Sequence, residues 1–477
     1  MAEPHRLAGL LTDLAAAGIA LRVEGEALRF TAPAGAMTDA LRARLQAAKP
    51  ELIAQLRAAP TDVLPASLTQ ARFWKLQQLD PDWSFYNVGF LFRIAGPLDA
   101  DRLRHAAEAV IARHDSLRTT LHESDGRLVQ RIATQGCVDW LAQDQRGAGE
   151  AAIRDTLQRE LLRRFDLAQG PMLRLTLVRT EDQAWMLQVC LHNVVFDMAS
   201  LLVILDELGR HYAGDAQSLP RPDQYAGYVA WQRLRTATGM DRRRDYWTAW
   251  LAQGEPPPWS WPPCTPQAPG GFRAIPTWTR LSAERTARLQ AFSRAHGVTP
   301  YIAVLTAYFR AVRSFTGCDD LTIGTTYSDR DDHRFAAMVG ASIGVPAIRV
   351  DMRDDPPTGT LLHRVRDSVS AAVTHQDLPI EEVLPRDSSG PLFRMVCTHF
   401  PETPHGRLRL PGMHVTWEEE WLNPISRPQL YLVMWGTPTP AGPRLTCHMM
   451  HREDVWDRDL AARMMAGFEA RIAEMVP

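Results

Sequence analysis

A proline-rich segment in the middle of the chain limits the folds that the chain can adopt. Seven prolines lie between residues 255 and 271. Proline lacks a backbone N–H and has a fixed φ, so this segment cannot continue a helix or an inner strand. Proline-rich stretches behave instead as stiff spacers. We therefore predict a crossing linker over 255–271 that divides the large region of the chain into two lobes, 67–254 and 272–477.

Length, charge and cysteine usage narrow the class of protein. The chain has 477 residues, 45% of them apolar and 23% charged, and a formal net charge of -2. These values suit a globular protein of two or three domains, and the charge favours proteins or small molecules over nucleic acid as partners. The six cysteines show no metal-ligand spacing. The chain has no basic leader and no apolar run of about 18 residues, so we expect no membrane contact and a cytoplasmic location.

The first 58 residues have the pattern of a small separate unit. Helical spacing over 7–14 is followed by two short alternating runs over 19–30, which predict a β-hairpin. Thr38 can cap a second helix, and Pro50 can open a third. The expected order is helix, hairpin, helix, helix, and a linker over 59–66 leads to the first lobe.

One strand-to-helix connection carries the candidate chemistry. The apolar run over 185–190 predicts a buried strand, and the periodic stretch over 201–211 predicts a helix. His192 and Asp197 fall between them, on the kind of loop where α/β proteins often display reacting groups. This spacing alone also fits a core histidine whose hydrogen bonds are satisfied and which has no catalytic role.

The connection resembles the His-His-x-x-x-Asp-Gly motif of condensation domains from nonribosomal peptide synthetases. Aligned on Asp197, the first His is His192, but Asn193 replaces the second His and Met198 replaces the Gly. In the family the second His is credited with positioning or deprotonating the acceptor nucleophile. The resemblance therefore implies a degenerate motif, because Asn193 can orient an amine but cannot take its proton near neutral pH.

Further blocks resemble the same family and follow its order. A Ser-x-x-Gln-x-Arg-x-Trp block contains Arg72, an Arg-His-Glu-x-Leu-Arg-Thr-like block contains Arg118, and others fall at 225–232, 324–330, 339–346 and 375–381. The resemblance implies an α/β (α+β) fold of two chloramphenicol-acetyltransferase-like lobes in a V, with a tunnel between them. Gly344 stands where the family has Asn, and Ala341 and Ser342 replace larger residues, so we expect a reshaped groove there.

The resemblance also assigns roles to residues. His192, Asn193 and Asp197 are the catalytic candidates, although the first His of the family is usually structural. Asp197 matches a motif Asp that pairs with an Arg of the second lobe, here Arg330, which would orient the loop and join the lobes. Ser200, Arg72 and Arg118 are expected to be structural. The pattern from His192 through Asp197 to Ser200 also overlaps that of heterocyclisation domains, which leaves cyclisation as a minor alternative.

Two other features each leave two interpretations open. One feature is a cluster of tryptophans and glutamates, made of Trp417, Trp421 and Trp435 with the three glutamates at 418–420. It is either core packing beside a solvated face or an aromatic, acidic pocket for a cationic amine.

The N-terminal unit resembles the small, ααβ-type β-hairpin docking domains of tubulysin-type assembly lines, which capture the tail of the preceding subunit. Arg22 and Arg29 are either contacts for carboxylates in that tail or the solvated face of the hairpin.

The resemblances imply an acyltransferase. It would take an acyl or peptidyl thioester from the carrier protein of an upstream subunit, delivered on a 4′-phosphopantetheine arm, with no bound cofactor or metal of its own. The acceptor would be an amine or hydroxyl, on an acceptor carrier protein or on a free small molecule in a chain-releasing step. The alternative is a catalytically silent scaffold that gates the chain or recruits a tailoring enzyme.

Overall fold

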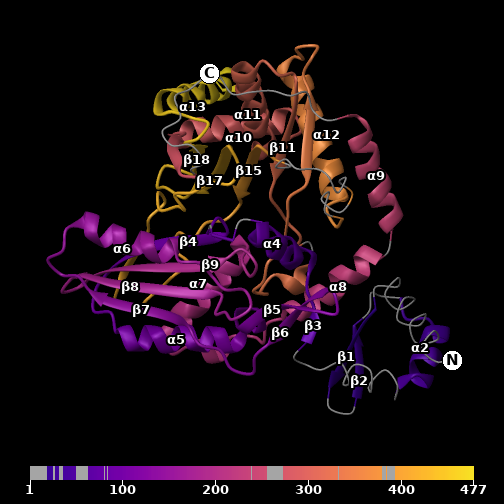
Figure 1. Ribbon diagram of the computed structural model, residues 1–477, viewed down its shortest axis with the longest axis vertical. Coiled ribbons are helices and arrows are strands. Elements are labelled where there is room, and N and C mark those ends of the chain that lie inside the picture. The colour runs from indigo at the N-terminus through magenta and orange to yellow at the C-terminus, as the bar shows by residue number, and fades with distance from the viewer. Residues whose placement is uncertain are drawn as a thin grey trace.

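The structure is a computed structural model. It describes residues 19–24, 27–31, 36–49, 63–79, 81–82, 84–237, 239–254, 272–330, 332–378, 383 and 393–476. The predicted crossing linker and the predicted helices over 7–14 and from Pro50 lie outside the described residues. The described residues form a small N-terminal part and two large lobes, one above the other in the view of Figure 1.

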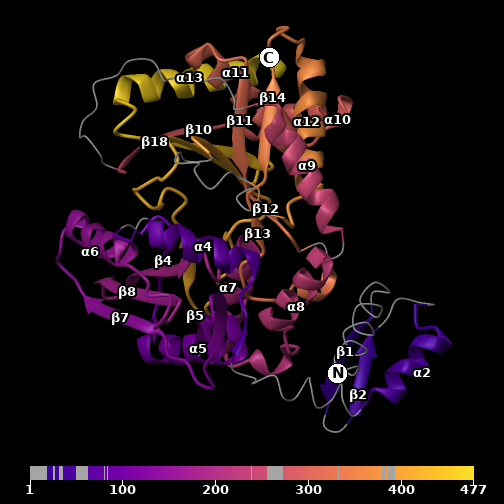
Figure 2. The same cartoon turned by 45° about the vertical axis from the view of Figure 1, so that its right-hand side comes forward.

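The N-terminal part contains the predicted hairpin and the helix that follows it. Strands β1 (Ala20–Glu24) and β2 (Ala27–Thr31) pair antiparallel, and helix α2 spans Asp39–Ala47. The Thr38 hydroxyl accepts a hydrogen bond from the Leu41 N–H at 3.2 Å, which caps the helix as predicted. Figures 1 and 2 both place this part to one side of the lobes, beside α8 (Tyr225–Ala237).

The first lobe is built on a five-stranded sheet in the order β16-β4-β9-β8-β7, with a three-stranded sheet, β3-β6-β5, beside it. The strands are β3 (Val63–Pro65), β4 (Asn87–Ala95), β5 (Thr119–Ser124), β6 (Arg127–Ile132), β7 (Asp139–Asp144), β8 (Leu173–Glu181), β9 (Ala184–His192) and β16 (His414–Trp417). The helices are α4 (Leu68–Leu79), α5 (Ala100–Arg113), α6 (Glu150–Leu162) and α7 (Met198–Ala213), with short 3-10 turns η1 (Asp115–Arg118) and η2 (Ala216–Ser218).

Strand β9 is central to this lobe because both of its faces are buried. Leu187, Val189 and Leu191 join the cluster that contains α5 and α7. Met186 and Cys190 point the other way and pack with α6. A strand covered on both faces is apolar along most of its length, which is why the run over 185–190 carries so little alternation.

The second lobe has a six-stranded sheet in the order β10-β18-β17-β15-β11-β14 and a small hairpin of β12 and β13. The strands are β10 (Ala274–Arg280), β11 (Asp320–Thr325), β12 (Tyr327–Ser328), β13 (Ile343–Gly344), β14 (Ala347–Asp351), β15 (Met395–Phe400), β17 (Leu430–Thr437) and β18 (Arg444–Arg452). The helices are α10 (Ala283–Ala295), α11 (Pro300–Thr316), α12 (Thr358–Thr374) and α13 (Arg458–Met475), with a 3-10 turn η3 (His333–Phe335).

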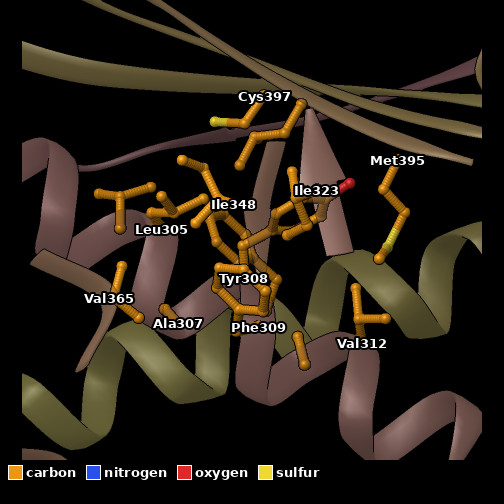
Figure 3. Close-up of a cluster of buried hydrophobic side chains, with 14 of the residues drawn as sticks. Leu305, Ala307, Tyr308, Phe309, Val312, Ile323, Ile348, Val365, Met395 and Cys397 are labelled. Atoms are coloured by element: carbon orange, nitrogen blue, oxygen red, sulfur yellow. The ribbon is translucent and has the colours of Figure 1, made fainter. Parts of the chain in front are cut away.

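Helix α11 forms the centre of the second core. Leu305, Tyr308 and Phe309 lie against Ile323 of β11 and Cys397 of β15 (Figure 3). All five side chains are fully buried. Burying a large apolar side chain contributes roughly 1.5–3 kcal/mol, so this helix is a main source of stability for the lobe.

Two segments cross the predicted lobe boundaries. Helix α9 (Met240–Ala252) falls within the predicted first lobe, yet Trp247 and Trp250 belong to the second core. Strand β16 falls within the predicted second lobe, yet it extends the first sheet, with Trp417 opposite Phe92. Val63–Pro65, in the predicted linker over 59–66, pairs with β6. Sequence patterning finds such elements but does not say which sheet or core each one joins.

Helix α8 ties the lobes together from one side. The Tyr225 hydroxyl is 2.7 Å from the Ser67 hydroxyl of the first lobe and donates to the Ala341 carbonyl of the second lobe at 2.7 Å. Gly340 lies so close to the Tyr225 ring that a Cβ at position 340 would be 2.1 Å from it. Only glycine fits there.

Candidate functional site: the motif loop at the lobe seam

The motif loop, residues 192–198, runs from the end of β9 to the start of α7. The strand extends to His192, two residues beyond the predicted run, and the helix starts at Met198 rather than at residue 201. The earlier start follows from Asp197, whose carboxylate accepts the Ser200 N–H at 2.8 Å and caps the helix. Asp197 is therefore the last residue before the helix, fixed by its own side chain.

His192 is 2% exposed and lies in an aromatic cage. The rings of Phe73, Tyr86 and Phe165 meet its imidazole edge-on, with centroids 6.1–6.3 Å away. Its Nδ1 accepts the Val194 N–H at 3.1 Å, so the proton of the neutral ring sits on Nε2. Burial lowers the pKa of His192 to about 3. This imidazole is neutral near pH 7, and its basic nitrogen is already occupied.

Asn193 differs from His192 because its side chain is only half-buried. Its backbone N–H donates to the Tyr86 carbonyl at 2.8 Å, which fixes the main chain. Within the described part of the chain, no hydrogen bond holds the side-chain amide. The Asn193 amide therefore keeps a donor and an acceptor available for a bound molecule.

Asp197 meets Arg330 across the lobe seam. Arg330 donates from Nε to Oδ2 at 2.9 Å and from Nη2 to Oδ1 at 2.7 Å, while Asp197 is 2% exposed. The Ser200 and Ser342 hydroxyls donate to the same carboxylate at 2.7 and 2.6 Å. Burial opposes ionisation, but Arg330 and the two hydroxyls outweigh it and hold the pKa of Asp197 below its ordinary value.

Arg330 is also held by the backbone of its own lobe. It donates to the Phe335 and Met338 carbonyls at 2.6 and 2.7 Å, in addition to its contacts with Asp197. The fork geometry of a guanidinium allows such simultaneous contacts. Ser342 also holds Asp197, and the sequence did not predict this contact. The block over 339–346 was interpreted only as having smaller side chains, and no sequence pattern indicates the hydrogen bond from Ser342 to Asp197.

The two other motif arginines lie apart from this ion pair. Arg118 pairs with Asp115 and donates to the Ala133 carbonyl, which are local contacts within the first lobe. Arg72 lies on α4, with its guanidinium carbon 6.0 Å from the centroid of the Phe73 ring. Phe73 in turn contacts His192, so Arg72 is near the aromatic cage and Arg118 is not.

The glutamates of the Trp and acid cluster are each paired with arginine. Glu418 pairs with Arg93 and Arg154, Glu419 with Arg444 at 3.2 Å, and Glu420 with Arg280. The Trp421 N–H donates to the Gln188 amide oxygen at 2.9 Å. The carboxylates are therefore balanced by arginines, and the interpretation of this cluster as an acidic pocket for a cationic amine loses its support.

In the N-terminal hairpin, Arg22 and Arg29 are direct partners in the antiparallel register. Their roles stay a prediction.

Among the residues that the structure describes, no group of three or more His, Cys, Asp or Glu side chains could hold a metal ion. Within the same residues, no helix is both long and apolar enough to span a bilayer.

Comparison with known proteins identifies the family. A condensation domain model matches residues 61–399, and a TubC N-terminal docking domain model matches residues 8–58. Chondramide synthase of Chondromyces crocatus is 31% identical over 87% of this chain and 11% of that protein. Cyclosporin synthetase of Tolypocladium inflatum is 30% identical over 74% of this chain and 2% of that protein. The chain thus spans only a small part of the length of these relatives.

Solved structures share the fold. The X-domain from teicoplanin biosynthesis has a TM-score of 0.74 at 22% identity, with 88% of this chain and 96% of that chain covered. A condensation domain of chain release from the enacyloxin polyketide synthase has 0.64 at 21% identity, covering 98% and 96%. The EpoB cyclization-docking bidomain from Sorangium cellulosum has 0.70 at 22% identity, covering 100% and 99%.

These likenesses confirm the predicted α/β fold of two chloramphenicol-acetyltransferase-like lobes. The matched family model covers well over half of the chain and includes the whole motif loop. The docking model covers the part that precedes the lobes. The chain therefore belongs to the condensation domain family of nonribosomal peptide synthetases, with a docking domain of the TubC type ahead of the lobes.

Proposed function

We propose that this chain transfers an acyl or peptidyl group from an upstream carrier protein to an amine, or less readily to a hydroxyl, without a histidine base at position 193. The docking domain would bind the tail of the upstream subunit, and the phosphopantetheine arm of the carrier would bring the thioester to the motif loop. The acceptor attacks the thioester carbonyl, the C–S bond breaks, and the carrier keeps the thiol.

The observation that carries this proposal is the complete set of hydrogen bonds around Asp197. Arg330, Ser200 and Ser342 hold the loop in one position, and Asn193 is its polar side chain without a partner among the described residues. Positioning a nucleophile can supply roughly 7–11 kcal/mol of a barrier, whereas general-base help is worth about 10²–10⁴-fold. A positioned amine with a free-base fraction can therefore react at this loop, while an alcohol needs a base.

The test is intact-protein mass spectrometry of the acyl-loaded upstream carrier mixed with this protein and a panel of amines and alcohols. We expect loss of the acyl chain that requires an acceptor and that falls when Asn193→Ala is introduced. A carrier that binds through residues 1–58 but keeps its chain with every acceptor, even with Asn193→His, would favour the scaffold.

A silent scaffold is the second candidate, supported by the neutral, enclosed His192 and by the fold shared with the teicoplanin X-domain, whose solved complex includes OxyB. A chain-releasing role is supported in the same limited way by the fold shared with the enacyloxin domain. Heterocyclisation has the weakest support. The pattern would place a carboxylate where His192 is caged by aromatic rings.

A further inference from the structure

A second ion network begins at the residue that precedes Arg330. This residue, Asp329, has a buried carboxylate with partners of its own. Arg235 of α8 donates to it from Nη1 at 2.9 Å and pairs with it again through Nη2. The Tyr228 hydroxyl of the same helix donates to Oδ2 at 3.2 Å. Two adjacent residues thus carry opposite charges to different elements, since Arg330 meets the motif loop and Asp329 meets α8.

The Arg235 guanidinium also holds a second buried carboxylate. It pairs with Asp377, which lies in the block over 375–381. Arg243 of α9 donates to the other oxygen of Asp377 at 2.8 Å. A guanidinium can bond two carboxylates at once because its N–H groups form a fixed, planar fork. Arg235 therefore fixes the Asp329 side chain relative to two helices and to a separate segment of the second lobe.

Asp329 connects this network to Asp197. Its backbone N–H donates to the Ser342 carbonyl at 2.8 Å. The Ser342 hydroxyl in turn donates to Asp197 at 2.6 Å. Arg330, the next residue in the chain, makes the ion pair with the same carboxylate. The contacts therefore run without a break from Arg235 to both side chains that the second lobe directs at Asp197.

The other end of the network reaches the first lobe. Gln232 of α8 donates to the Tyr228 hydroxyl at 3.0 Å and accepts the Leu68 N–H, at the start of α4, at 3.2 Å. Tyr228, Gln232 and Arg235 are spaced by four and three residues, so they share one face of α8. This face sets the turn that carries Arg330 in place against the first lobe.

We infer that Arg235 is a positioning residue for the motif loop: by fixing Asp329, it places Arg330 and Ser342 against Asp197 in the arrangement used for acyl transfer. In the described part of the chain, Arg235 makes no hydrogen bond or ion pair with residues 192–198, so it acts through Asp329. The inference rests on the proposed function where it concerns acyl transfer. The conformation of the loop can be measured without a carrier or an acceptor.

The experiment is hydrogen–deuterium exchange with mass spectrometry on the full chain, comparing the parent with Arg235→Gln. The probes are the backbone N–H groups of Ser200 and Ser342, which both donate to Asp197. We expect both to exchange at least about tenfold faster, because a hydrogen bond to a charged group is worth that much in a local opening equilibrium. Arg233→Gln is the matched control, since it makes the same change at an exposed residue of the same helix, and it should exchange like the parent.

Peptides from α11, in the core of the second lobe, are the internal reference and should keep the parent rate in every variant. Unchanged exchange at the two serines in Arg235→Gln, or equal acceleration there and in α11, would overturn the inference. If Arg235→Gln does not fold, Asp329→Asn gives the same test, because it removes the charge that Arg235 holds and keeps the size of the side chain. We expect the same faster exchange in that variant, and exchange like the parent would again overturn the inference.

Single-turnover acyl transfer tests the route through Asp329. Arg235→Gln, Asp329→Asn and the double variant should each slow transfer by a similar factor of about tenfold, since both substitutions break the same contact and misplace the same loop. A double variant that is slowed by the product of the two single effects would overturn this route.

The two proposals fail in different ways. A parent that never transfers a chain, together with faster exchange at the two serines in Arg235→Gln, would reject the transferase and keep Arg235 as the residue that positions the loop. A parent that transfers the chain at a rate that Arg235→Gln does not change would keep the transferase and reject the positioning role.

Discussion

The two ends of the motif loop differ in how fully their polar groups are satisfied. At the Asp197 end, a buried carboxylate receives hydrogen bonds from a guanidinium, two hydroxyls and two backbone N–H groups. At the other end, His192 is enclosed by aromatic rings, and the Asn193 amide has no hydrogen-bond partner among the described residues.

The two ends of this short loop therefore differ in what their side chains can do. The Asp197 end joins the two lobes and fixes the loop through Arg330 and Ser342. At the Asn193 end, a half-buried amide has no hydrogen-bond partner among the described residues and cannot take a proton near neutral pH. The same loop thus joins a fully hydrogen-bonded end to an end whose side-chain amide is unbonded among the described residues.

Breaking the Asp197 end should have the largest effect. Arg330→Ala leaves the Asp197 carboxylate buried without its cation, which typically costs about 3–5 kcal/mol. We expect the free energy of unfolding in urea to fall by that amount. Arg118→Ala, which removes a local and partly exposed ion pair, is the control and should cost about 1 kcal/mol or less. Equal losses in both variants would contradict a special role for the seam.

Restoring the other end should change the rate and leave stability largely unchanged. Asn193→His supplies an imidazole at the half-buried position, and we expect acyl transfer to an amine to rise by about 10²-fold. Single-turnover loss of the acyl chain from the carrier, followed by mass spectrometry, measures this rate. No gain would mean that positioning alone limits turnover or that another group already accepts the proton.

Removing one hydrogen-bond donor to Asp197 tests how much that single bond contributes to stability. Ser342→Ala deletes one hydrogen bond to a charged acceptor, which contributes about 1.5–3 kcal/mol, and other donors remain. Because the folded pKa of Asp197 lies below its unfolded value, its contribution is present above that unfolded value and is lost as the pH falls through the folded pKa. We expect the deficit of the variant in urea unfolding to shrink as the pH falls below about 4.

The smallest effect at neutral pH is expected from His192→Phe, which loses one hydrogen bond worth about 1 kcal/mol and keeps an aromatic ring in the cage. The folded pKa of about 3 lies below the ordinary value of 6.5, so the unfolded chain takes up this proton first. Stability therefore falls as the pH drops from about 6.5 to about 3. The variant should lose less stability than the parent over this range in thermal unfolding. Parallel curves would contradict the burial of His192.

The local sequence signal at Thr38 predicted a helix start correctly, since Thr38 caps the helix with its side-chain oxygen. Ser282 and Asp457 cap helices in the same way. Such caps depend on residues three positions apart, so they are visible in the sequence. The predicted start of α7 was too late because Asp197 was considered for chemistry and not for capping.

The assignment of segments to lobes could not be predicted. Helix α9 and strand β16 have ordinary patterns, and packing alone places them in the core or sheet of the other lobe. Hydrophobic periodicity shows which face of an element is buried but not which partner covers it.

The sequence by itself determined the family, the order of its blocks and the strand-to-helix connection that carries His192 and Asp197, since all of these are properties of local residue strings. The tertiary structure alone decided that Ser342 joins Asp197, that His192 is enclosed by aromatic rings, and that the Gln376 side chain packs against the backbone at Gly344. These depend on burial and on groups that lie far apart in the chain or in different lobes, and folding alone brings such groups into contact.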